Sequence, residues 1–209
     1  MSTLIGILAS GAGTTAQALI DASSANRLGG GKVIVLVSDQ SEAGALQIAR
    51  DGGVEALFVD PASYQSRSDY CEAVASELKS RDVQVVCSAG FMKILSPGFV
   101  KAFEGNILNN HPSLLPSFPG AHSVADALAW GVKVTGATIH LIDEETDHGP
   151  IISQFPVHIE PGDDEASLHE RIKVIERVIY PQAVSAFCSG RVKVEGRLVT
   201  VEPNEGNKA

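Results

Sequence analysis

Residues 4–20 read LIGILASGAGTTAQALI, and this stretch decides which fold the chain adopts. The apolar run at 4–9 is typical of a short buried strand, and Gly11 and Gly13 mark a turn directly after it. A helical pattern follows, with apolar side chains at Ala16, Leu19 and Ile20. A strand, a glycine turn and a helix in this order let backbone N–H groups face an anion at the positive helix N-terminus.

The same alternation of strand and helix continues along the chain. Further strands are expected at residues 32–38, 56–59, 83–87 and 107–111, and helices at residues 41–51, 69–79 and 98–103. Strands that alternate with helices indicate a parallel sheet covered on both faces. The sequence therefore predicts an α/β fold that is doubly wound and Rossmann-like, in one domain spanning residues 1–209.

The glycine turn alone also fits a dinucleotide-binding module. Gly11, Gly13 and Ala16 match the pattern G-x-G-x-x-G/A, and Asp39 ends the second expected strand, where an acid can bind a ribose. A third interpretation is a glycine turn that only lets the helix pack against the strand.

Composition narrows the class of protein and its partners. The chain has 209 residues, 44% of them hydrophobic, and a formal net charge of −9. This charge argues against broad binding to nucleic acid or to a membrane surface. Three widely spaced cysteines without a CxxC pair make a disulfide framework or a zinc site unexpected and favour the cytoplasm. No signal peptide or apolar membrane span is expected.

Residues 106–120 read NILNNHPSLLPSFPG and carry the candidate chemistry. Because side chains alternate along a strand, Asn109 and His111 are expected to point the same way at its end. An amide donor beside a titratable imidazole can stabilise an oxyanion and move a proton. The alternative is a turn after a buried strand, with a histidine that merely caps a neighbour.

The C-terminal part adds strands at 135–142 and 151–159, separated by the acidic loop 143–150. A helix is expected from a cap at Asp163 or Asp164 to about Tyr180, followed by a small hairpin within 191–202. Glu176 falls on the flank of the apolar stripe of this helix, and Lys173 is its neighbour on the helix surface. An acid at such a position usually lies at the rim of the buried face. No set of ligands with metal spacing is apparent.

Residues 109–120, followed by Asp147-His148-Gly149-Pro150, resemble the phosphoribosylglycinamide formyltransferases of purine synthesis, within the folate-dependent formyltransferase family. The resemblance extends over residues 10–14, residues 89–96 and the helix with Glu176 before Tyr180-Pro181. It implies transfer of a formyl group from 10-formyltetrahydrofolate to the amine of 5′-phosphoribosylglycinamide (GAR), without a metal. It also implies an antiparallel C-terminal part of the sheet, and it allows a homodimer.

The resemblance also implies a role for each matching residue. The implied catalytic residues are Asn109, His111 and Asp147. Residues 1–103 would form a half that binds the ribotide, and residues 104–209 a catalytic and folate-binding half. The implied GAR-binding residues are Gly13, Thr14, Thr15, Lys173 and Glu176. The implied folate-binding residues are Arg67, Met92, Lys93, Ile94, Leu95, Asn109, Asp143, Glu144 and Asp147.

Two positions depart from the family pattern. Thr14-Thr15 stands where many relatives carry a Ser-Asn or similar pair, so a side-chain contact from position 15 is lost or changed. Asn110 stands where Ile or Thr is common, and we expect it to alter packing and not chemistry. A hydrolase that releases formate from the folate is the alternative within the superfamily, but it would need no ribotide site.

Overall fold

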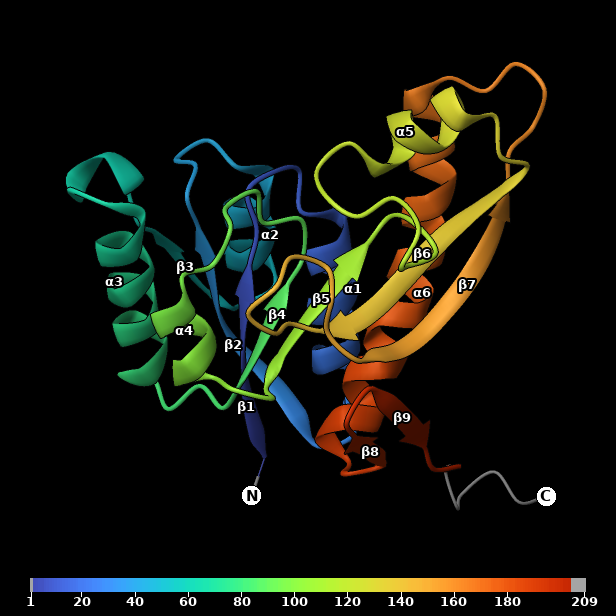
Figure 1. Ribbon diagram of the computed structural model, residues 1–209. Helices are drawn as coiled ribbons and strands as arrows, with labels where there is room; N and C mark the ends of the chain where they lie inside the picture. Colours follow the sequence, from blue (N-terminus) through green and yellow to red (C-terminus); the bar gives the residue numbers. More distant parts are fainter. Residues whose placement is uncertain (1, 204–209) are drawn as a thin grey trace.

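The computed structural model describes residues 2–203 and is built on a seven-stranded sheet with the order β3-β2-β1-β4-β5-β6-β7 (Figure 1). The strands are β1 (Thr3–Leu8), β2 (Gly31–Ser38), β3 (Glu55–Phe58), β4 (Val85–Ser88), β5 (Ile107–His111), β6 (Val134–Leu141) and β7 (Ile151–His158). The first five strands in this order pair in parallel, and β6 and β7 continue the sheet in antiparallel fashion. The predicted α/β fold with an antiparallel C-terminal part is confirmed.

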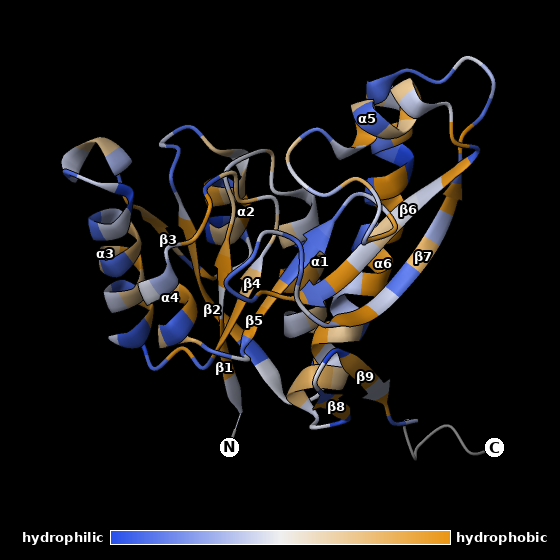
Figure 2. Ribbon diagram, in the orientation of Figure 1, coloured by the Kyte–Doolittle hydropathy of each residue, from blue (hydrophilic) through white to orange (hydrophobic). Residues whose placement is uncertain are grey.

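Helices cover both faces of the sheet, because the buried strands present apolar side chains on both sides. One face packs against α1 (Thr14–Ser24), α2 (Gly44–Asp51) and α6 (Glu165–Cys188). The other face packs against α3 (Arg67–Lys79) and α4 (Pro97–Ala102). The remaining elements are α5 (Ser123–Trp130), the short 3-10 helix η1 (Pro61–Ser63) and the hairpin of β8 (Val192–Glu195) and β9 (Leu198–Val201). Figure 2 shows the apolar strands enclosed between these layers.

The carboxyl ends of the parallel strands meet at one edge of the sheet. Polar residues and loops gather at this edge. The glycine turn at residues 10–13 follows β1, residues 89–96 follow β4, and β5 ends in Asn109, Asn110 and His111. Ligands of open α/β sheets bind at this edge.

Helix α6 is longer than predicted. We expected it to end near Tyr180, because Pro181 lacks an N–H and clashes with the preceding turn. The helix instead continues through Pro181 to Cys188. Ala183, Val184 and Ala186 in this last part are buried in the core, and that packing offsets the missing hydrogen bond.

Two further local features differ from, or add to, the prediction. Helix α3 begins at Arg67, two residues before the predicted start, because Ser66 caps it by accepting a hydrogen bond from the Asp69 N–H (3.1 Å). The Leu115–Pro116 peptide bond is cis.

Within residues 2–203, no helix has the length and apolar character needed to cross a membrane.

Tyr180 ties α6 to the centre of the sheet. Its buried hydroxyl lies 2.9 Å from the Ser88 carbonyl oxygen and 2.8 Å from that of Leu108, so it bridges β4 and β5. We expect Tyr180→Phe to lower the free energy of unfolding by about 1–3 kcal/mol, because the hydrogen bond to two buried carbonyls is lost. Urea unfolding measures the change, with Tyr64→Phe on the partly exposed Tyr64 as the control. Equal stability of the two variants would contradict this role.

Candidate active site

A cavity of about 500 Å³ opens at the carboxyl edge of the sheet. Its wall combines the glycine loop, the segment after β4, the end of β5, the loop between β6 and β7, and one face of α6. The sequence-predicted residues that line it are Gly13, Thr14, Thr15, Met92, Lys93, Ile94, Leu95, Asn109, His111, Asp143, Glu144, Asp147, Lys173 and Glu176. The fold therefore brings together segments that are more than 160 residues apart in the sequence.

Strand β5 sets the direction of Asn109 and His111. Asn109 pairs with His140 of β6, and His111 pairs with Thr138, in an antiparallel register. Alternation along β5 places Asn109 and His111 on one side of the sheet and Asn110 on the other. Pro112 then ends the strand.

His140 orients the amide of Asn109. The Asn109 Nδ2 lies 3.1 Å from His140 Nε2, and His140 Nδ1 lies 2.8 Å from the Leu141 carbonyl oxygen. A carbonyl only accepts, so the proton of His140 sits on Nδ1 and Nε2 accepts from the amide. Burial lowers the pKa of His140, which keeps the ring neutral and in this role. One N–H of Asn109 is thus held in place, and the second is left for a ligand.

His111 is buried and fixed by two neighbours. Its Nε2 donates to the Phe118 carbonyl oxygen at 2.9 Å. Its Nδ1 lies 3.4 Å from Asp147 Oδ2. The imidazole therefore presents its second nitrogen at the place where a carboxylate and the cavity meet, which suits proton transfer.

Asp147 is held by the backbone of the loop before α5. Its Oδ2 accepts a hydrogen bond from the Gly120 N–H (2.7 Å), and its Oδ1 lies 3.8 Å from His140 Nε2. The residue adopts a left-handed backbone with φ of 53°, which Asp tolerates better than most residues. Two residues later, any Cβ at Gly149 would lie 1.9 Å from the Leu141 carbonyl oxygen, so the loop can pass this close to β6 only with glycine.

The glycine loop has the geometry of an anion site. Gly13 precedes α1 with φ of 82°, and a Cβ there would lie 2.5 Å from the Ala45 Cα. Only glycine fits this position, and it opens the first turn of α1 toward the cavity. The Ser10 hydroxyl accepts from the Met92 N–H (2.9 Å) and so joins the glycine loop to the segment after β4.

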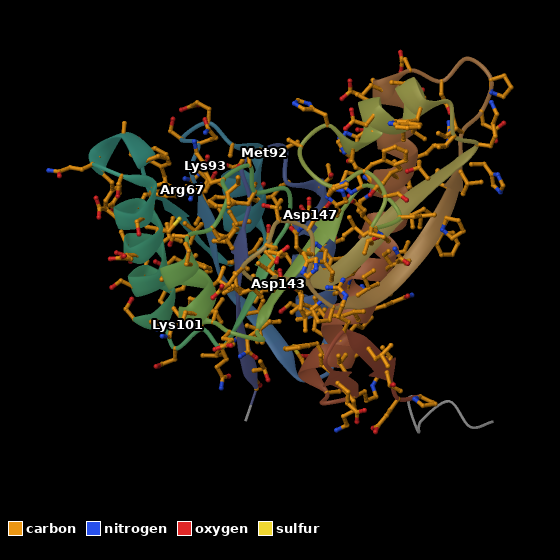
Figure 3. All side chains as sticks on the ribbon, in the orientation of Figure 1. Arg67, Met92, Lys93, Lys101, Asp143 and Asp147 are labelled. Atoms are coloured by element: carbon orange, nitrogen blue, oxygen red, sulfur yellow. The ribbon has the colours of Figure 1, made fainter. Side chains whose placement is uncertain are left out.

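The cavity rim formed by the segment after β4 is apolar and exposed. Met92 is 74% exposed and Ile94 is 59% exposed. Large apolar side chains that are this exposed at a cavity rim indicate a binding surface for an apolar ligand. Asp143 faces them across the cavity from the acidic loop, where its carboxylate lies 3.0 Å from His148 Nδ1. Figure 3 shows Met92 and Lys93 near the carboxyl edge, with Arg67 farther out on the side of α3. Arg67 is exposed and is not part of the cavity wall, so the structure does not place it with the other folate-binding candidates.

Glu176 is buried more deeply than its place in the helical pattern predicted, and it faces the cavity where the family resemblance implied a GAR contact. The helical pattern alone favoured a rim residue, but the side chain is only 2% exposed and points into the cavity from the middle of α6. Burial raises the pKa of Glu176, while the nearby amide of Asn110 and the charges of Lys173 and Arg177 act to lower it. Lys173 lies one turn earlier and also pairs with Glu170 at 2.8 Å.

Sequence reasoning did not assign Asn110 or His169 to the site. Asn110 and His169 both line the cavity, and His140 contacts Asn109 directly. His169 lies four and seven residues before Lys173 and Glu176, a helical spacing that could have revealed it. Burial and the charge of Lys173 lower its pKa.

The dinucleotide interpretation fits the structure poorly. Asp39 is 3% exposed, lies 3.9 Å from Lys93 Nζ and is not in the cavity wall, so its carboxylate does not face a ligand there. Within the described part of the chain, no group of three or more His, Cys, Asp or Glu residues is placed to hold a metal ion.

Comparison with known proteins gives one consistent result. The family model described as formyl transferase matches residues 4–184. A phosphoribosylglycinamide formyltransferase of Mycobacterium tuberculosis is 46% identical over 195 residues, 93% of this chain and 89% of the relative. The human trifunctional purine biosynthetic protein adenosine-3 is 37% identical over 91% of this chain and 19% of its own length. The crystal structure of glycinamide ribonucleotide transformylase 1 from Symbiobacterium toebii superposes with a TM-score of 0.94 at 43% identity, covering 96% of this chain and 94% of that chain.

Proposed function

The chain belongs to the formyl transferase family, and we propose that it uses Asn109, His111 and Asp147 to move a formyl group from 10-formyltetrahydrofolate to GAR. Formyl transfer to GAR in purine biosynthesis is the activity of its named relatives and of this chain. The observation that carries the residue assignment is the convergence of an amide, an imidazole and a carboxylate on one cavity wall.

The proposed reaction is addition followed by elimination. The GAR amine attacks the formyl carbon, a C–N bond forms, and the carbonyl oxygen becomes an oxyanion. The free N–H of Asn109 and the protonated ring of His111 donate to that oxygen, where one such donor is worth about 3–4 kcal/mol of barrier. The bond between the formyl carbon and N10 of the folate then breaks. The proton lost by the amine reaches N10 through Asp147, His111 and ordered water.

The ribotide is proposed to bind on the side of α1 and α6. Its phosphate would lie at the first turn of α1, on the N–H groups of Gly13, Thr14 and Thr15. The positive charge of Lys173, on α6, attracts the same phosphate. Glu176 accepts hydrogen bonds from the ribose hydroxyls. These hydroxyls are neutral donors, so the carboxylate does not need a positively charged partner to bind them.

The folate is proposed to bind between the two loops on the other side. The pterin contacts the apolar rim at residues 92–95 and the backbone of residues 143–147. Arg67 lies outside this cavity, so its charge would act on the part of the folate that extends toward α3. We further propose that residues 1–209 act as one domain, since the sheet runs without a break through both halves of the chain.

A direct assay tests the proposal. Purified protein is mixed with GAR and 10-formyldihydrofolate or its dideaza analogue, and the deformylated folate is followed by absorbance, with a reaction lacking GAR as the control. We expect turnover that depends on GAR. Formate release at the same rate without GAR would identify a hydrolase instead. Thermal stabilisation by NAD but not by GAR would favour the dinucleotide module.

The phosphate loop supports a milder prediction. Thr15 is 7% exposed and lies in the first turn of α1, where we expect backbone N–H groups to hold the phosphate. Thr15→Asn should therefore change KM for GAR by no more than about threefold, below about 1 kcal/mol of binding free energy. Steady-state kinetics with varied GAR measures this. A tenfold change in either direction would mean that the side chain contacts the ligand.

A further inference from the structure

Asn110 lies on the opposite side of β5 from the catalytic candidates. Leu108, two residues earlier on the same strand, is buried in the core shared with α1 and α6. Alternation therefore turns Asn110 toward the same helices, one step closer to the carboxyl end of β5. The strand thus offers Asn109 and His111 to one side of the cavity and Asn110 to the other.

The neighbour of Asn110 on that side is Glu176. The two side chains line the same cavity, and the Asn110 amide lies close enough to the Glu176 carboxylate to lower its pKa. Each also keeps a buried oxygen, Asn110 Oδ1 and Glu176 Oε1, that has no hydrogen-bond partner among the described residues. Buried acceptors are rarely left unpaired, and at the wall of a cavity they indicate a ligand that brings hydroxyl or amine donors.

We propose that Asn110 is a positioning residue for the ribotide, whose amide holds the Glu176 carboxylate toward the sugar hydroxyls and so sets affinity for this substrate. The inference rests on the proposed function, because it takes the ribotide as the ligand of this side of the cavity. It revises the sequence-based expectation that Asn110 changes packing alone.

The same contact makes ribotide affinity depend on pH in a defined direction. The charged or titratable groups near Glu176 are Lys173, Arg177 and Tyr180 on its own helix, and Tyr180 is already engaged with two carbonyls. From β5, the group that faces it is the Asn110 amide. Removing the Asn110 amide takes away an influence that lowers the pKa of Glu176. The carboxylate is then protonated at higher pH, and ribotide binding weakens first on the acid side.

The test uses Asn110→Val, which suits a strand, and Asn110→Asp, which keeps the shape but replaces the donor by a negative charge. We expect KM for GAR to rise about tenfold in both, the effect of losing a hydrogen bond to a charged group, while kcat and KM for the folate stay within about twofold. The acid limb of kcat/KM for GAR should move to higher pH. Asn110→Thr, whose hydroxyl can donate, should recover part of the affinity.

The matched control is Asn106→Val. Asn106 is exposed just before the other end of β5 and donates to the Glu104 carbonyl oxygen, so its loss should leave KM for GAR unchanged. Unchanged KM and pH profile in both Asn110 variants, with an active wild type, would overturn this inference alone. A fall in kcat with no effect on KM would overturn it as well. A wild-type protein that transfers nothing to GAR would overturn the proposed function together with this inference.

Discussion

His111→Ala is expected to lower kcat by about a thousandfold, or about 4 kcal/mol of barrier. The imidazole is held at both nitrogens, by the Phe118 carbonyl at 2.9 Å and by Asp147 at 3.4 Å. Alanine removes both the donor to the oxyanion and the group that passes the proton. Water that enters the space can replace neither at a fixed position.

This loss should appear in kcat more than in ribotide affinity. The groups proposed to bind GAR lie at α1 and α6, on the other side of β5 from His111. Calorimetric titration with GAR should therefore show similar affinity in the variant and in the wild type. His158→Ala is a matched control, because His158 is exposed on β7 outside the cavity. A His111→Ala protein that is folded and retains a tenth or more of the wild-type kcat would refute the assigned role.

How much of this site the sequence predicts depends on the element that carries each residue. Period-2 alternation at residues 107–111 correctly placed Asn109 and His111 on one side of a strand end, since that arrangement is local. The position of Asp147 is different. It lies 36 residues after His111, and only the antiparallel return of β6 and the following loop bring the two together, so local patterns carry no signal for it.

The errors have physical reasons of the same kind. The helical period placed Glu176 on the flank of α6, but depth is decided by what packs over the flank, and here the end of β5 covers it. The helix continues past Pro181 because core packing outweighs one lost hydrogen bond. Arg67 was placed near the substrates by family resemblance, whereas the start of α3 holds it outside the cavity.

Asp147→Asn is expected to lower kcat by about a hundredfold to a thousandfold while the protein keeps its fold. Asn tolerates the left-handed backbone of this position as well as Asp does, and its amide oxygen can still accept from the Gly120 N–H. What is lost is the negative charge beside His111 and a carboxylate that can take a proton from the attacking amine. Neither loss disturbs the loop, so the defect should be chemical and not structural.

The measurement compares kcat, KM for GAR and the thermal unfolding midpoint of Asp147→Asn with those of Asp126→Asn, an isosteric change at an exposed acid of α5 outside the cavity. Asp126→Asn should match the wild type in all three. In Asp147→Asn only kcat should fall, because the ribotide contacts lie at α1 and α6. If KM for GAR rises tenfold and kcat is preserved, Asp147 binds substrate instead of moving protons. The proton transfer from the amine, here assigned to Asp147, would then have to take place through water and His111 without this carboxylate.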